Sequence, residues 1–217
     1  MYTVCGKGLL SSNSYIYWNE NDGADVSKGE KHEAAVIDAG CSPADIFPEA
    51  EKRNLKIKYI ILTHAHIDHS YYLDSFLAEA DGSVSVCHVS EESLFYDTVA
   101  NVSEMIGAPK TFAAPDMKVS ESDTLSVGGK RIEFIHTPGH TPGGMCIYVP
   151  EEKIMFTGDT LFCNGFGRTD LGGSARDLAE SIKKLYTMDT DITILPGHGC
   201  SSTIGEESAW GIPSVLC

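Results

Sequence analysis

Apolar stretches that end in a polar residue recur along this chain. The run IKYIIL, from Ile57 to Leu62, is short and rich in β-branched residues, which predicts a buried strand. Four more stretches have a similar form and ending: AAVI before Asp38, RIEFI before His136 and His140, KIMFTG before Asp159, and ITILPG before His198. Because polar side chains gather beyond the carboxyl ends of sheet strands, these endings predict one site built from several strands.

Two helix starts are marked by the residues that usually cap helices. Ser42 precedes Pro43, and Ser174 precedes an acidic residue, Asp177, at the third position. Apolar residues then recur at helical spacing in the second helix and predict a face that packs on a sheet: Ala175, Leu178, Ile182 and Leu185.

The order helix, strand, histidine loop occurs at residues 43–69 and again at 174–198, which suggests a duplicated architecture. Helices that alternate with strands indicate the α/β class. A chain of 217 residues with 42% hydrophobic content can bury one substantial core, and no stretch has the composition of a linker. We therefore expect a single domain over residues 1–217.

Charge and hydropathy narrow the partners and the location. The net charge of −15, without a cluster of Lys and Arg, argues against nucleic acid and against anionic membrane surfaces as partners. No apolar run has the length of a signal-peptide core or of a membrane span. We therefore expect a soluble, cytoplasmic protein.

The chain has 7 cysteines, an odd number, and they are scattered without a CxxC pair. This pattern predicts free thiols, most of them buried. Cys163 follows Asp159 by four residues, so it either packs as a small apolar residue or faces the site.

The segment THAHIDHS, Thr63 to Ser70, contains three histidines and an aspartate directly after a predicted strand. A histidine-rich surface loop is the simpler explanation. However, the whole chain has only 8 histidines, and the preceding strand reads as buried. The segment therefore predicts a metal site.

The strand ends together offer seven candidate ligands, more than one ion requires, so two divalent ions are expected. One ion is assigned to His64, His66 and His140, the other to Asp68, His69 and His198, with Asp159 bridging them. Nitrogen and oxygen donors without sulfur suit zinc, the metal that we expect, or iron or manganese.

The motifs HAHIDH, HTPGHTPGG, FTGD and LPGHG, in this order, resemble the metallo-β-lactamase superfamily. The segment from Leu161 to Gly173, LFCNGFGRTDLGG, is similar to the short glyoxalase-II-like hydrolases of that superfamily. This resemblance implies a four-layer αββα sandwich with a dinuclear metal site at one edge, and it implies metal roles for the same seven residues. It also implies that Asp38 lies beside the site and orients a metal-bound histidine.

Two features depart from the family pattern. Small residues commonly follow the HxHxDH motif, whereas Tyr71 and Tyr72 follow it here and are expected to narrow the pocket. Only residues 199–217 follow His198, so we expect no helical C-terminal domain of the kind that binds glutathione in full glyoxalase II.

The resemblance and the paired ions predict a hydrolase in which a metal-bound hydroxide attacks a thioester or related ester, such as acylated glutathione or a smaller thioester. Asp68 is expected to orient the hydroxide as well as to bind metal. A thiolate leaving group needs little protonation, which agrees with the absence of an obvious general acid near the motifs. The small positive charge of the site suggests an anionic small molecule, with Arg168, Tyr71 and Tyr72 as candidate contacts.

Other functions stay open at this point. A mononuclear iron oxidoreductase is one, because persulfide dioxygenases resemble this chain, including a GRTD segment. A lactonase would use the same chemistry as the leading hypothesis, and a non-catalytic metal-binding module is the third possibility. His88 and His136 are assigned no role.

Overall fold

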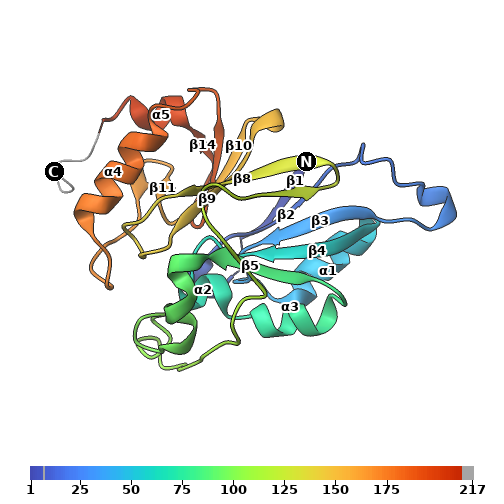
Figure 1. Cartoon of the computed structure of the whole chain (residues 1–217), viewed down its shortest axis with the longest axis horizontal. Coiled ribbons are helices and arrows are strands. Elements are labelled where there is room, and N and C mark those ends of the chain that lie inside the picture. Colours follow the sequence, from blue (N-terminus) through green and yellow to red (C-terminus); the bar gives the residue numbers. More distant parts are fainter. Residues whose placement is uncertain (7, 212–217) are drawn as a thin grey trace.

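Two six-stranded sheets form the centre of the protein, as a computed structural model that describes residues 1–6 and 8–211 shows (Figure 1). The first sheet comprises, in spatial order, β1 (Tyr2–Cys5), β2 (Ser14–Trp18), β3 (His32–Ile37), β4 (Leu55–Ile61), β5 (Val84–His88) and β6 (Met117–Val119). The second comprises β14 (Ser202–Thr203), β13 (Thr193–Pro196), β10 (Ile154–Gly158), β9 (Met145–Val149), β8 (Lys130–His136) and β7 (Thr124–Val127). A separate hairpin pairs β11 (Leu161–Phe162) with β12 (Gly165–Phe166).

Helices cover the outer face of each sheet. The α-helices are α1 (Pro43–Lys52), α2 (Ile67–Ser70), α3 (Leu73–Glu79), α4 (Ala175–Leu185) and α5 (Ile204–Ser208). The 3-10 helices are η1 (Leu9–Ser11), η2 (Val26–Lys28), η3 (Val89–Tyr96) and η4 (Pro150–Glu152). Figure 1 shows α1 and α3 on one side of the molecule and α4 on the opposite side, with both sheets between them.

The core consists of three apolar layers, which explains the alternation along the strands. Between the sheets, Ile37 and Ile61 of the first pack with Phe134 and Phe156 of the second. The residues that alternate with them face the helices, as Val36 and Ile60 do toward α1 and α3. The outer face of the second sheet packs on α4 through residues that include Leu185. The arrangement is the αββα sandwich that the resemblance to the metallo-β-lactamase superfamily implies.

The pairing of the strands brings the predicted polar endings to one edge. Strands β3, β4 and β5 run parallel, and so do β10 and β13, so their carboxyl ends lie at matching edges of the two sheets. The two edges are joined by a bridge between Ser12 and His198 and by the Asn13 N–H, which donates to the Gly197 carbonyl over 2.7 Å. Residues that follow strands of both sheets therefore meet at this edge.

The helix starts agree with the prediction. The Ser42 hydroxyl accepts the Ala44 N–H at the start of α1, and the Ser174 hydroxyl accepts the Asp177 N–H at the start of α4. None of the helices in residues 1–6 and 8–211 is long and apolar enough to cross a membrane. Residues 212–217, the end of the expected domain, include Cys217 and lie outside the described part of the chain.

Candidate metal centre

Asp38 fixes the start of the histidine segment. It follows β3 directly, has a left-handed backbone (φ 60°), and is buried. Its carboxylate accepts the Thr63 N–H over 2.7 Å and the Thr63 hydroxyl over 2.9 Å. Its Oδ2 also lies 2.9 Å from Nδ1 of His69. Asp38 thus ties the end of β3 to the loop after β4, and it lies beside the site, where the resemblance to the family places it.

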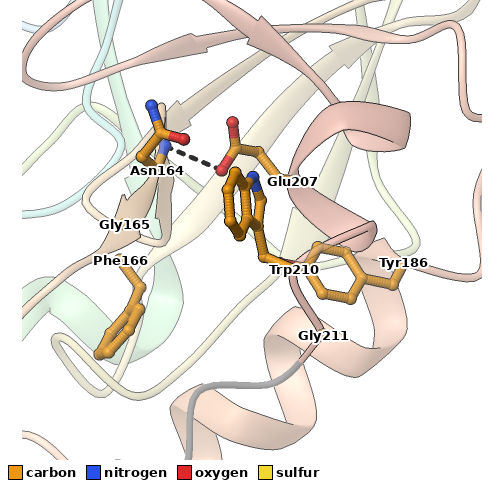
Figure 2. Close-up of a pocket in the computed structure, with 7 residues that line it drawn as sticks. All are labelled: Asn164, Gly165, Phe166, Tyr186, Glu207, Trp210 and Gly211. Atoms are coloured by element: carbon orange, nitrogen blue, oxygen red, sulfur yellow. Dashed lines mark hydrogen bonds between the residues drawn. The ribbon is translucent and has the colours of Figure 1, made fainter.

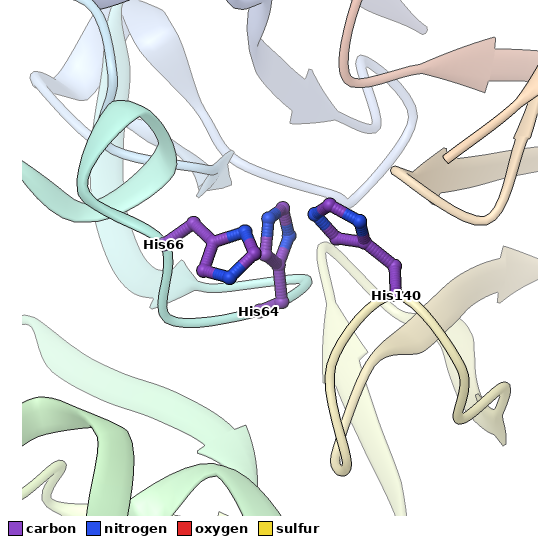
Figure 3. A group of neighbouring side chains, drawn as sticks. All are labelled: His64, His66 and His140. Atoms are coloured by element: carbon purple, nitrogen blue, oxygen red, sulfur yellow. The ribbon is translucent and has the colours of Figure 1, made fainter. Parts of the chain in front are cut away.

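Three buried histidines point their rings at one another (Figure 3). The candidate ligand atoms of His64, His66 and His140 all lie within 4.8 Å of one another. Nδ1 of His140 lies 2.6 Å from the Arg168 carbonyl, and Nδ1 of His64 lies 3.1 Å from the Thr63 hydroxyl. With these Nδ1 atoms engaged, the Nε2 atoms of the rings are left for a shared ligand.

The unpaired polar atoms of this group fit a cation. Nε2 of His64, His66 and His140 and Oδ1 of Asp159 are buried and have no hydrogen-bond partner. Buried polar atoms without partners are costly and require an explanation. A divalent ion among the three histidines would satisfy their Nε2 atoms, and imidazole nitrogen with a neighbouring carboxylate oxygen is a donor set that suits zinc or iron.

A second group adjoins the first. Asp68, His69 and His198 also have candidate ligand atoms within 4.8 Å of one another. Oδ2 of Asp68 lies 3.2 Å from Nε2 of His198 and 3.7 Å from Nε2 of His69, and the two Nε2 atoms are 3.3 Å apart. The structure thus brings the residues assigned to the second ion together.

Asp159 lies between the two groups, as expected of a bridging ligand. Its Oδ1 is 3.4 Å from Nε2 of His69, and its Oδ2 is 3.6 Å from Nε2 of His140 and 3.7 Å from Nε2 of His198. Gly197 makes room for this arrangement, because a methyl group there would overlap Oδ1 of Asp159 and lie 2.6 Å from Cε1 of His69. The motif LPGHG therefore needs its first glycine for close packing.

The first group is electrically suited to receive a cation. Burial, with the neighbouring histidines, lowers the pKa of His64 well below its ordinary value, and burial with His140 lowers the pKa of His66 to about 3. Both imidazoles are therefore neutral at physiological pH, which is the form that binds a metal.

Carboxylates dominate the electrostatics of the second group. Burial alone would lower the pKa of His69, but Asp68, Asp159 and Asp38 outweigh it and raise this pKa to about 10. Burial opposes ionisation of Asp68, yet the adjacent His69 and His198 hold its pKa well below the usual range. Without metal this group is a network of charged hydrogen bonds, so metal binding here must displace protons.

A pocket of about 370 Å³ opens onto the two groups. Its wall includes five of the candidate ligands, together with Arg168 and apolar side chains from the hairpin β11–β12 and from loops. Arg168 reaches the pocket as expected, but its Nε and Nη2 each donate to the Asp170 carboxylate over 2.6 Å. The positive charge of Arg168 is therefore already paired with the Asp170 carboxylate.

Tyr71 and Tyr72 are placed differently from the expectation. Both rings pack against the core cluster beneath the first sheet, and neither is among the residues that line the pocket. The reason is local geometry, because the helical turn α2 rotates the positions after His69 away from the ligands. The two tyrosines therefore do not narrow the pocket in this structure.

Glu91 is a buried carboxylate that the sequence did not single out. Its Oε2 accepts the N–H of Ala65 over 2.9 Å, and its Oε1 accepts the N–H of Gly143 over 2.7 Å. Burial raises its pKa, while the hydrogen bonds from these two N–H groups work in the opposite direction. Glu91 thus joins the loop of His64 and His66 to the loop of His140. Its only sequence signal is an acidic residue shortly after the strand that ends at His88.

The described thiols, and two of the three remaining histidines, His88 and His136, lie outside the ligand groups. Of the cysteines in the described residues, Cys41, Cys87 and Cys146 are buried, Cys5 and Cys163 are partly exposed and Cys200 is exposed. The Cys163 sulfur accepts a hydrogen bond from the Asn164 side-chain amide over 3.3 Å, and Cys163 is not among the residues lining the pocket. The rings of His88 and His136 stack on each other with centroids 3.9 Å apart.

Comparisons with known proteins agree with this geometry. A family model described as "Metallo-beta-lactamase superfamily" matches residues 8–198. The hydroxyacylglutathione hydrolase GloC of Haemophilus influenzae is 34% identical over 186 residues, which cover 82% of this chain and 85% of GloC.

Solved structures show the same similarity in three dimensions. The BLEG-1 B3 metallo-beta-lactamase superposes with a TM-score of 0.86 at 29% identity, covering 96% of this chain and 97% of that one. TTHA1623, solved in a di-iron-bound form, superposes with a TM-score of 0.79 at 27% identity, covering 98% of this chain and 99% of that one.

Proposed function

Because the chain belongs to the metallo-beta-lactamase superfamily, we propose that its metal centre hydrolyses a thioester or a related ester. The similarity to GloC, named a hydroxyacylglutathione hydrolase, supports a thioester, since acylated glutathione is one. We propose two divalent ions, with zinc as the first candidate and iron or manganese as alternatives. The di-iron form of TTHA1623 supports a pair of ions in a protein of this shape.

The observation that carries the proposal is the pair of adjoining ligand groups. The first group holds three buried Nε2 atoms without hydrogen-bond partners, those of His64, His66 and His140. Asp68, His69 and His198 form the second, and Asp159 lies within 3.7 Å of histidines from both. Such an arrangement suits two ions that share a carboxylate.

When bound, the two ions supply an activated water at neutral pH and polarise a carbonyl group. The chain prepares the geometry for this chemistry. Asp38 holds Nδ1 of His69, and the Arg168 carbonyl holds Nδ1 of His140, so that Nε2 of each ring faces the centre. Asp68 lines the pocket and stays ionised, so its carboxylate can accept a hydrogen bond from the attacking water and orient it.

The lining of the pocket favours attack by water on a substrate with a good leaving group. Among the described residues that line it there is no Ser, Thr, Cys, Lys or Tyr to act as a covalent nucleophile. The same lining offers no hydroxyl or ammonium group to protonate an amide nitrogen as it leaves. A thiolate leaves without such help, so a thioester suits the pocket better than an amide.

A lactone is a related ester and would be hydrolysed by the same groups. A mononuclear iron oxidoreductase is the alternative of a different class, and it would leave the second ligand group without a role. The two classes differ in metal content and in their need for oxygen.

The test combines metal analysis with two assays on the purified protein. We expect two ions per chain and release of thiol from a small acyl thioester in the absence of oxygen. One iron per chain, with oxygen uptake that depends on a persulfide substrate, would contradict the proposal and support the oxidoreductase.

A further inference from the structure

A second cavity lies next to the metal-centre pocket. This lateral groove, about 490 Å³ in volume, is lined by the apolar residues Val99, Ala100, Val102, Met105 and Leu171 and by two acidic residues. Three of its apolar residues, Val102, Met105 and Leu171, also line the metal-centre pocket. The two cavities therefore adjoin at these three side chains, and the groove has a volume usual for small-molecule sites.

The lateral groove presents large apolar side chains to solvent. Val99 is 72% exposed and Met105 is 61% exposed. Exposed apolar groups that gather beside a catalytic centre indicate a binding site for an apolar ligand.

The charges along the groove disfavour an anionic ligand. Its two acidic residues are Glu104 and Asp170, and the cation next to them, Arg168, is engaged by both oxygens of Asp170. No other Lys or Arg is among the described residues that line the groove or the pocket. A carboxylate placed here would meet Glu104 without a free cation to pair with. The net charge of the metal site led us to expect an anionic substrate, but the walls of the groove offer such a substrate no free cation to pair with.

Two residues in the walls of these cavities have a strained backbone conformation. Val102 has φ 68° and Leu10, on the pocket wall, has φ 54°, a region that bulky side chains rarely adopt. Strain of this kind persists where the surroundings enforce it, commonly at functional sites.

The neighbouring Asn101 supplies that enforcement. Its side chain donates to the Lys110 carbonyl over 2.8 Å and accepts the Ser103 N–H over 3.0 Å. Its carbonyl accepts the N–H of Ile67, the residue between His66 and Asp68, over 2.9 Å. The wall of the groove is therefore anchored to the metal-binding segment and does not drift independently of it.

We propose that the lateral groove binds an uncharged, apolar acyl chain of the substrate, with the scissile carbonyl at the metal centre. The proposal rests on the hydrolase function proposed above and names its substrate class. Burial of a methylene contributes about 0.8 kcal/mol, so each added methylene raises kcat/KM by about two- to fourfold in a partly open groove. A carboxylate at the end of the acyl chain removes this gain.

A different pocket supplies the control. It has a volume of about 300 Å³ and is lined by Asn164, Gly165, Phe166, Tyr186, Glu207, Trp210 and Gly211 (Figure 2). It shares Phe166 with the metal-centre pocket but has no metal-ligand candidate in its wall. Its carboxylate, Glu207, accepts the Asn164 N–H over 2.8 Å, and Trp210 is 77% exposed. Trp210→Ala therefore removes an exposed apolar side chain, as Met105→Ala does, but from a pocket without metal-ligand candidates.

The test measures kcat/KM for acetyl, butyryl, hexanoyl and succinyl thioesters of N-acetylcysteamine, an uncharged thiol. We expect a rise from acetyl to hexanoyl and a low value for succinyl. Met105→Ala should flatten the rise with chain length, and Met105→Lys should improve the succinyl value. Trp210→Ala should behave as the unsubstituted protein.

Two results would overturn the groove. The first is that kcat/KM does not change with acyl-chain length, or that its dependence on chain length is lost in Trp210→Ala but kept in Met105→Ala. The other is a preference for succinyl over butyryl. Calorimetric binding of S-hexyl thioethers to the metal-free protein tests the groove without catalysis, so failure of every thioester as a substrate would count against the proposed function alone. Thioether binding that is unaffected by Met105→Lys would count against the groove alone.

Discussion

Asp159 is the residue on which the two ligand groups depend jointly. In Asp159→Asn the amide nitrogen replaces an oxygen that lies between histidines of both groups, so one ligand bond is lost. We expect the second ion to bind weakly and hydrolysis to fall by about a hundredfold or more, with the fold retained. Metal content after dialysis, turnover and circular dichroism measure these three outcomes.

The matched control for this change is Asp191→Asn, an exposed aspartate that pairs with Lys153. It should keep both ions and full activity. Two tightly held ions and near-normal turnover in Asp159→Asn would show that Asp159 does not bridge the groups.

Between elements, Glu91 is the connection with the clearest consequence, since it joins the ligand loops that follow β4 and β8. Glu91→Gln replaces one acceptor by an NH₂ group, which leaves the N–H of Ala65 or Gly143 unpaired at a cost of about 1–3 kcal/mol. We expect metal affinity to fall by about 10- to 100-fold, as measured by chelator competition. The absorption bands of the cobalt-substituted protein should shift as well.

Glu92→Gln is the control, because Glu92 is more exposed and pairs with Lys118. A purely structural role for Glu91 would lower stability but leave metal affinity and the cobalt spectrum unchanged. That pattern would refute a positioning role.

The stacked histidines at the ends of β5 and β8 predict acid sensitivity. Burial, and then the neighbouring His136, lowers the pKa of His88 from 6.5 to about 4. Between these pH values the folded protein binds fewer protons than the unfolded chain, so the free energy of unfolding falls as the pH falls. Protonation would also remove the acceptor at Nδ1 of His88 for the Ser90 N–H.

In His88→Gln we expect this part of the pH dependence to disappear. Urea denaturation of the metal-free protein at pH values across that window measures it against the unsubstituted protein, in which the other histidines titrate equally. Identical slopes in the two proteins would rule out the contribution of His88.

The sequence predicted the elements that carry the ligands because their signals are local. A β-branched run such as Ile57–Leu62 needs only its own pattern to indicate a strand, and a polar residue at its end needs only parallel pairing to reach the shared edge. The role of Glu91 could not be predicted from the sequence, because it depends on N–H groups of residues 65 and 143, which no local sequence pattern connects. Tyr71 was expected to narrow the pocket because it is near the ligands in sequence. Its ring instead packs against the core cluster beneath the first sheet.

In the whole molecule, the metal centre lies across the seam between the sheets. The ligands from residues 64–69 follow the first sheet, whereas His140, Asp159 and His198 follow strands of the second. Each ion bound by both should stabilise the folded protein by about 4 kcal/mol when metal is present at a thousand times its dissociation constant. Removal of metal with a chelator should therefore lower Tm by roughly 8–16 °C for each ion lost in a chain of this size.

Calorimetry with and without chelator, followed by addition of zinc, measures this change. Asp159→Asn should show a smaller shift, because one ion is already weakly held. An unchanged Tm after verified removal of the metal would mean that the ions do not couple the two sheets.

The lateral groove and the metal ligands belong to different parts of the chain, and this has an evolutionary consequence. The ligands lie directly after strands, whereas the groove is formed by connections at residues 99–105 and 170–172. Connections tolerate replacement far better than strand ends do. After duplication of a gene for such a protein, the two copies can come to prefer different substrates while both keep the same hydrolytic chemistry. A laboratory exchange of residues 97–110 that retains Asn101 would follow the same route toward new substrates.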